Sequence, residues 1–295
     1  MQEITLQQLL EAGCHFGHKS ERWHPRASEF IYTEKDGIHI IDLAKTREGL
    51  LRAAAFVTEL VATGSEIIAV ATKRQAKDIV KEAAESAGMP YFTERWIGGF
   101  LTNWDEIKKN IEKANRMITE QENDAWKIFP KHEQMQLKRE LRKLINYYGG
   151  VLKLTRPPQA LFVVDVRKEI AAVREAVRVG LPVVAIVDTN SDPRGIGYPI
   201  PANDDAVGSI MLLTRILTQA YSAGRQMREK GAEKAKTADQ KQPEDSGAAR
   251  EEKTPAGQDV KKSEKSGPAA GKLQTEPKKK RGRPKKTAVN AAADN

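Results

Sequence analysis

Two segments of the chain repeat one order of apolar and mixed stretches. In each, a short apolar run precedes an amphipathic stretch, a Gly-x-Pro step and a second extended run. The pattern predicts a strand at 66–71 and a helix at 73–87 in the first segment, and strands at 161–164 and 182–187 around a helix at 167–179 in the second. Continuously apolar strands in two strand–helix–strand units indicate a parallel sheet with helices on both faces.

The region between these units has a narrower apolar pattern. In Asp105–Asn123 and in Lys131–Tyr148, apolar residues recur with 4-3-4 spacing, which is the period of a coiled coil. Pro130 breaks the helix between them. The thin seam and the dense surface charge favour an antiparallel helical hairpin that projects from the sheet domain. Two ordinary amphipathic helices packed on the domain are the alternative.

The two ends of the folded part carry further elements. Thr5 caps a predicted short helix, and apolar residues at 30–32 and 38–41 flank a hairpin-like turn at 34–37. A closing helix is expected at 204–228, with one apolar face.

Composition separates the last part of the chain from the rest. The protein has 295 residues, of which 39% are hydrophobic, but 229–295 contains no aromatic residue. Such a segment cannot bury enough apolar surface to offset its chain entropy, so we expect it to be disordered. The predicted organisation is an α/β domain in two parts, 1–104 and 149–228, a helical hairpin at 105–148 and a tail at 229–295.

The net charge of +9 is concentrated near the end of the chain. A cluster at 278–286 predicts polyanion binding, with a solubilising tail as the alternative. Its members are Lys278, Lys279, Lys280, Arg281, Arg283, Lys285 and Lys286. The cluster also resembles an AT-hook, a minor-groove DNA-binding motif. Sequence-independent binding to RNA is favoured over DNA binding.

Cysteine content and hydropathy bear on the compartment. Cys14 is the single cysteine, so no internal disulfide is possible, and this fits a reducing environment. The first residues are polar and lack the apolar core of a signal peptide. No apolar run is long enough to span a bilayer. We therefore expect a cytoplasmic protein.

The residues at the predicted strand ends do not indicate an enzyme. In a parallel sheet the carboxyl ends of the strands share an edge where ligands bind. The turns after these strands lack the G-x-G-x-x-G and G-x-x-x-x-G-K-[ST] patterns, and the chain has no G-x-S-x-G elbow. Cys14 lies beside His15, and adjacent side chains rarely form a productive nucleophile–base pair. No catalytic residue and no organic cofactor is predicted.

Cations and aromatic residues instead indicate contact with RNA. Lys73-Arg74 and Arg167-Lys168 are expected in first helical turns, where a phosphate offsets their charge; solvated cations beside capping Thr72 and Asp165 are the alternative. Residues 19–26 and 95–104 mix cations with tryptophans, which suits RNA, although a single tryptophan there is better explained by a half-buried core role. The RNA-binding candidates are Lys19, Arg22, Trp23, His24, Arg26, Lys73, Arg74, Arg95, Trp96, Asn103, Arg167 and Lys168.

Several long blocks, in order, resemble the bacterial small-subunit ribosomal protein two family. They are EAGCHFGHKSERWHPR, IYTEKDGIHIIDLAKT, ATKRQA, RWIGGFLTNW, ALFVVDVRKE and IVDTNSDPRGIGYPIPANDDA. The resemblance implies a flavodoxin-like, doubly wound α/β domain with an inserted coiled-coil hairpin. It implies a structural, ribosome-associated protein that binds small-subunit rRNA, adjoins other small-subunit proteins and docks the mRNA-binding ribosomal protein one. A DNA-binding nucleoid protein that acts through 278–286 is the alternative.

The resemblance also implies a zinc site in some members of the family. The corresponding residues in this sequence are His18, Asp188 and Asp204, whose imidazole and carboxylate groups are suitable zinc ligands. The alternative is that the two aspartates cap local backbone and that His18 contacts RNA or the core.

Overall fold

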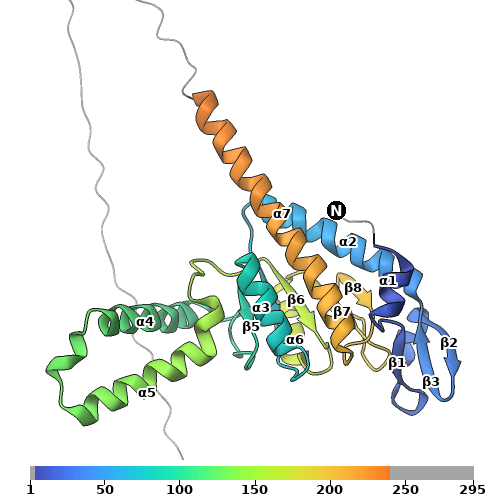
Figure 1. The fold of residues 1–295 in the computed structure, drawn as a ribbon, viewed down its shortest axis with the longest axis horizontal. Coiled ribbons are helices and arrows are strands. Elements are labelled where there is room, and N and C mark those ends of the chain that lie inside the picture. The colour runs from blue at the N-terminus through green and yellow to red at the C-terminus, as the bar shows by residue number, and fades with distance from the viewer. Residues whose placement is uncertain (1–3, 240–295) are drawn as a thin grey trace, which may run out of the picture. The chain divides into compact units, whose positions relative to one another are not determined.

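The computed structural model describes residues 4–239 of the chain, with side chains up to residue 231. Its centre is a parallel sheet with strand order β5-β4-β6-β7-β8 (Figure 1), which is the doubly wound order of flavodoxin. The strands are β4 Ile67–Val70, β5 Tyr91–Phe92, β6 Ala160–Val164, β7 Val183–Val187 and β8 Tyr198–Pro201. The predicted flavodoxin-like α/β class is confirmed.

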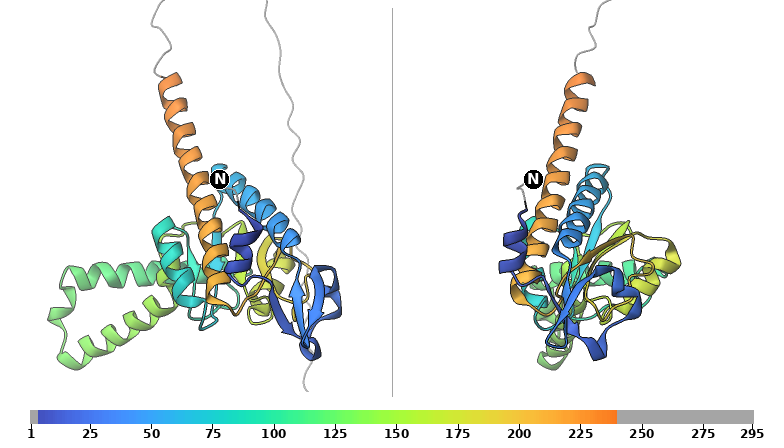
Figure 2. Two further views of the ribbon diagram at one scale, coloured as in Figure 1. Left: turned by 45° about the vertical axis from the view of Figure 1, so that its right-hand side comes forward. Right: turned by 90° about the vertical axis from the view of Figure 1, so that its right-hand side faces the viewer.

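Helices cover both faces of this sheet, as the apolar strands require. On one face lie α2 (Leu43–Ala62), α3 (Lys77–Ala87) and α7 (Val207–Asp239), with α2 and α7 side by side (Figure 2). On the other face lie α6 (Ile170–Val179) and the segment 96–101. Successive residues of each strand alternate between the two cores, and every residue of β4, β6 and β7 is buried.

A small antiparallel sheet, with order β1-β3-β2, precedes the domain. The predicted hairpin is confirmed: Asp36 and Gly37 have positive φ angles of 54° and 72° at its turn, as a two-residue hairpin turn requires. Thr5 caps α1 through a reciprocal bond with Gln8. The elements are α1 Leu6–Glu11, β1 Phe16–Lys19, the 3₁₀ turns η1 Ser20–Arg22 and η2 Pro25–Phe30, β2 Ile31–Lys35 and β3 Ile38–Ile41.

The helical hairpin projects from the sheet domain, as predicted (Figure 1). In its outer part Met117 is buried against Leu141 and Trp126, and Ile118 packs, partly buried, against the same cluster. Trp126 lies in the turn between the helices and closes this small core. The elements are α4 Trp104–Glu122, η3 Ala125–Ile128, α5 Lys131–Tyr148 and η4 Gly149–Val151.

Three helices begin later than their apolar patterns indicated. The N-cap of α3 is Ala76 rather than Thr72, and the N-cap of α6 is Glu169 rather than Asp165. The closing helix begins at 207, not 204, and continues to 239 rather than ending at 228, so 229–239, which was expected to be disordered, is helical. The first-turn placement predicted for Lys73-Arg74 and Arg167-Lys168 was therefore wrong: these residues lie in the turns between strand and helix.

The elements that were not predicted include α2 and β8. Strand β8 contains two prolines, which is tolerated only at the edge of a sheet. The amide of Ala202 donates to the carbonyl of Val187 in β7. Backbone groups alternate in direction along a strand, so the nitrogens of Pro199 and Pro201, which carry no hydrogen, lie on the outer side of β8. There the Thr46 hydroxyl of α2 donates to the carbonyl of Pro201 at 2.5 Å.

The predictions for 240–295, including the polyanion-binding cluster at 278–286, lie outside the described residues. Within the part of the chain that is described, no helix combines the length and apolar character that crossing a membrane requires.

Because α2 packs closely on β8, we expect one methyl group added at Gly49 to lower the stability of the fold. A Cβ added at Gly49 would lie 2.5 Å from the carbonyl oxygen of Pro199. We expect Gly49→Ala to lower the free energy of unfolding by about 1–3 kcal/mol, measured by urea denaturation. Gly231→Ala is the control, because nothing lies within 4 Å of the added Cβ. Equal unfolding midpoints for the two variants would contradict the packing described.

Candidate functional site

Charged side chains gather where the strands of the parallel sheet end. Lys73 follows β4 and Asp165 follows β6, while Asp188 and Asp204 follow β7 and β8. The gap between β4 and β6 is the point where the strand order reverses, which is the place where doubly wound sheets bind ligands. The fold therefore brings these four residues to one edge.

Lys73 is the centre of this cluster. Its Nζ lies 2.6 Å from Oδ1 of Asp204, 2.7 Å from Oδ1 of Asp205 and 3.1 Å from Oδ2 of Asp165. Asp165 has a φ of 69°, a costly conformation for a residue with a Cβ. Its side chain accepts a hydrogen bond from the amide of Lys168.

His18 reaches the same cluster from the small antiparallel sheet. Its Nδ1 lies 3.1 Å from Oδ1 of Asp188, and its Nε2 lies 2.9 Å from the side-chain nitrogen of Asn190. The strand can approach this closely because Gly17 has no Cβ; an added Cβ would lie 2.7 Å from the Thr189 side chain. The amide of His18 donates to the Thr189 hydroxyl.

The cluster carries more acid than base. Burial raises the pKa of Asp204 to about 7, and the nearby charges of Asp188 and Asp165 act in the same direction against Lys73. Burial lowers the pKa of the Lys73 amine, but the carboxylates around it outweigh burial and the net shift is upward. The carboxylate of Asp188, which accepts a hydrogen bond from the protonated His18 ring, raises the pKa of His18, and burial opposes this shift.

These residues have the donors and the spacing of a metal site. Among the described residues, His18, Asp188 and Asp204 form a group whose candidate ligand atoms all lie within 4.8 Å of one another. Oδ2 of Asp204 is buried and has no hydrogen-bond partner, although buried carboxylate oxygens are normally paired. One imidazole and two carboxylates fit zinc, and a divalent cation would offset the excess negative charge.

Two residues predicted to contact RNA have roles inside the protein. The Lys73 side chain is only 12% exposed and neutralises carboxylates. Trp96 is 6% exposed, and its Nε1 donates to Glu175. The structure corrects the prediction for both side chains, since neither lies free on the surface.

Other predicted RNA contacts come together although they are distant in sequence. Arg22, Trp23 and His24 face Arg167 across a hollow of about 480 Å³ at the strand ends. Arg26 and five further candidates lie outside this hollow. These five are Lys19, Arg74, Arg95, Asn103 and Lys168, and all of them are exposed. Arg26 is paired with Asp192 at 2.8 Å.

The segment 95–104 is held by one carboxylate. Glu175 of α6 accepts bonds from Trp96 Nε1, from the amides of Gly99, Leu101 and Thr102, and from the Thr102 hydroxyl, at 2.9–3.2 Å. Burial raises the pKa of Glu175, but these donors outweigh it and the pKa lies below its usual range. The loop that presents Arg95 and Asn103 therefore has a fixed shape.

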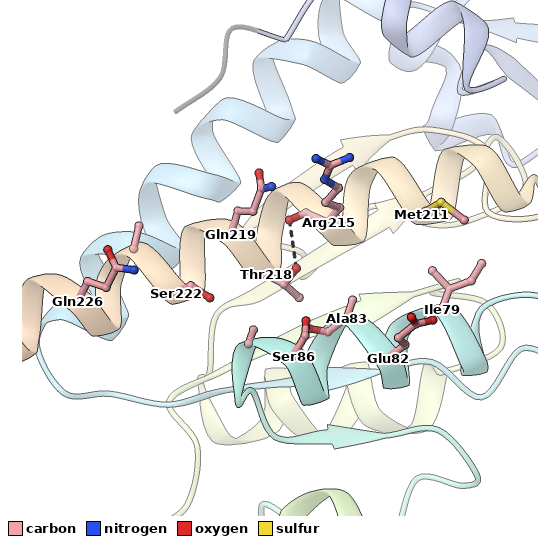
Figure 3. A pocket seen from close by; sticks show the side chains of 12 residues that line it. Ile79, Glu82, Ala83, Ser86, Met211, Arg215, Thr218, Gln219, Ser222 and Gln226 are labelled. Carbon is pink, nitrogen blue, oxygen red and sulfur yellow. Dashed lines mark hydrogen bonds between the residues drawn. The ribbon is translucent and has the colours of Figure 1, made fainter.

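A second cavity, of about 710 Å³, lies between α3 and α7. Glu82 and Arg215 extend from these two helices, and most of the other lining side chains are small or uncharged (Figure 3). None of the predicted site residues lines it.

Comparisons with known proteins decide the family. The sequence model described as ribosomal protein S2 matches residues 9–224. The small ribosomal subunit protein uS2 of Coprothermobacter proteolyticus is 49% identical over 229 residues, covering 78% of this chain and 85% of the relative. The protein of the same name from Chloroherpeton thalassium is 48% identical over 220 residues, covering 75% and 88%. The chain belongs to the ribosomal protein S2 family.

Membership of the S2 family covers the candidate sites but not the tail. The cluster around His18 and Asp204 and the hollow at Arg22–His24 lie inside the matched residues, whereas 278–286 lies beyond them. The members of this family are ribosomal proteins, which serve translation, as the resemblance indicated. Their role is structural rather than enzymatic.

Sequence reasoning on this S2 chain missed three site residues. Glu175 carried no signal beyond an acid on a predicted helix. Asn190, which bonds His18, was expected at the strand-end edge but given no role there, and Asp192, which binds Arg26, was given no role. Each acts through a partner more than 70 residues away along the chain, and no local pattern reveals such pairs.

Replacing Glu175 tests whether its carboxylate holds the segment 95–104 of this S2 chain in place. Glu175→Gln puts an amide N–H₂ among donors, so we expect the free energy of unfolding at pH 7 to fall by about 1–3 kcal/mol. Because the folded pKa lies below the ordinary 4.5, the wild-type advantage is complete above that pH and shrinks as pH falls below it. Urea denaturation at several pH values measures both effects.

The matched control is Glu82→Gln on α3, an exposed acid for which we expect a change of no more than about 0.5 kcal/mol. If the difference in the free energy of unfolding between wild type and Glu175→Gln stayed constant down to pH 3, it would contradict the conclusion that ionised Glu175 holds the loop.

Proposed function

We propose that this protein is a structural constituent of the small ribosomal subunit and binds its rRNA. The observation that carries the proposal is membership of the S2 family across both parts of the α/β domain. The two relatives bear the name small ribosomal subunit protein. Neighbouring ribosomal proteins are then the expected protein partners, in a ribosome-associated, cytoplasmic setting.

The arrangement of cations and rings supports rRNA as the ligand. Arg22 and Arg167 come from separate parts of the chain and lie around one hollow with Trp23. Arginines bind phosphate, and exposed rings stack on unpaired bases. Docking of ribosomal protein one is a further part of the proposal; it rests on the family resemblance, and we assign it no surface.

Sedimentation tests the proposed function. On a sucrose gradient of a cell extract, we expect the protein in the small-subunit peak at moderate salt, because structural proteins make many phosphate contacts. Ribonuclease treatment should move it to the top of the gradient. Recovery of the protein only in ribosome-free fractions, with or without ribonuclease, would refute the proposal.

We also propose that His18, Asp188 and Asp204 hold one zinc ion. Zinc there would have a structural role rather than a catalytic one, because it would link the small N-terminal sheet to the segment that precedes α7. The unpaired Oδ2 of Asp204 and the shared spacing of the ligand atoms support this proposal. Lys73 orients Asp204 from its other oxygen.

Metal analysis tests the zinc site. We expect close to one zinc per purified wild-type chain and a large loss in His18→Ala, since one ligand is removed. A chelator should lower the melting temperature of wild type and leave that of His18→Ala unchanged. His132→Ala on α5 is the matched control, because its ring is 73% exposed and distant from the cluster. Equal, sub-stoichiometric zinc in all three proteins would contradict the site.

A further inference from the structure

The hollow beside the strand ends has the size of a small-ligand site. Its volume is about 480 Å³, within the roughly 300–1,000 Å³ that is typical of such pockets. One wall is the segment Arg22–His24, and the other is formed by the turns after β6 and β7, with Arg167 and Asn190.

Trp23 gives this hollow an aromatic wall. The indole is 39% exposed, and its ring lies 5.3 Å from the ring of His39, which supports it from the protein side. The chain has four tryptophans, and Trp96 and Trp126 are 6% and 5% exposed. Trp104, at the start of α4, is half-buried. Trp23 is therefore the most exposed tryptophan and is available to a ligand at the surface.

The hollow is also positively charged. Within residues 4–231, neither Arg22 nor Arg167 forms an ion pair. The acid of the lining, Asp192, is already held by Arg26 at 2.8 Å and by Arg194 at 2.9 Å. Two arginines are thus left to bind an anion without competition from that carboxylate.

Hydrogen bonds hold the walls in place before any ligand binds. The amide of His24 donates to the carbonyl of Thr189 at 2.8 Å. Asn190 bonds His18, and the Ser191 hydroxyl bonds Asn190. His24 Nδ1 accepts from the amide of Arg26, so the neutral ring carries its proton on Nε2 and can donate it to a ligand.

We propose that this hollow receives one unpaired nucleotide of RNA. The base stacks on Trp23, while Arg22 and Arg167 bind the flanking phosphates and the imidazole of His24 donates to the sugar or base. An aromatic face with flanking cations is the arrangement that binds single-stranded nucleic acid, and a paired base inside a helix cannot present its face to a wall. The inference rests on the proposed rRNA-binding function and assigns a site to it.

The test uses the full-length protein with two RNA probes, an unpaired 12-nucleotide strand and a blunt duplex of the same length. The fluorescence of Trp23 is isolated as the difference between wild type and Trp23→Phe. We expect the unpaired strand to quench this difference signal and the duplex to leave it unchanged. Quenching by the duplex to the same extent would overturn the proposal.

Affinity measurements extend the test. Trp23→Ala should weaken binding of the unpaired strand by about 5- to 150-fold, the range measured for the loss of one stacked base, while Trp23→Phe keeps a ring and should stay within about fivefold. Arg22→Gln with Arg167→Gln should reduce the slope of log affinity against log salt by about 1.4, for two phosphates on a single strand. Arg178→Gln, at the other end of α6, is the control for surface charge.

Three outcomes separate this proposal from the function on which it rests and from a free-nucleotide site. Wild-type affinity in Trp23→Ala, with a wild-type protein that still sediments with the small subunit, overturns the nucleotide site alone. Failure of wild type to bind any rRNA overturns both. Quenching by adenosine monophosphate as strong as that by the unpaired strand overturns RNA as the ligand and indicates a free-nucleotide site.

Discussion

Buried negative charge at the carboxyl edge of the sheet is the constraint on which the rest of the structure depends. Asp188 and Asp204 are almost completely buried, and isolated carboxylates in such a place are very costly. Lys73 and His18 supply the compensation, and they come from the first strand–helix unit and from the small sheet. The charge balance at this edge therefore joins the beginning, middle and end of the folded chain.

The same requirement fixes the surface beside the cluster. Asn190 bonds His18, and the next residues form the turn that binds Arg26. Placing His18 therefore also places the segment that carries Arg22 and Trp23. Glu175 has the corresponding role on the other side of the domain, where one carboxylate shapes a loop of glycines and tryptophans. In both places buried polar bonds position residues that face solvent.

Elements defined by local periodicity could be predicted from the sequence. Strands β4, β6 and β7 are apolar throughout because both faces are buried, and the helices of the projecting hairpin have a seam of their own. Boundaries set by tertiary bonds could not be predicted: Lys73 looked helical, but its ammonium group binds three carboxylates and α3 begins only at Lys77. Likewise β8, with two prolines in four residues, resembles a loop unless its edge position is known. The residues proposed to hold zinc were found by resemblance, since His18 and Asp188 are 170 residues apart.

The two prolines of β8 have a consequence for contacts between copies of this chain. An open sheet edge offers N–H groups on which another copy can add a strand. On the outer side of β8, Pro199 and Pro201 offer none, and Thr46 already occupies a carbonyl there. The outer side of β8 therefore gives a second copy of this chain no amide on which to extend the sheet.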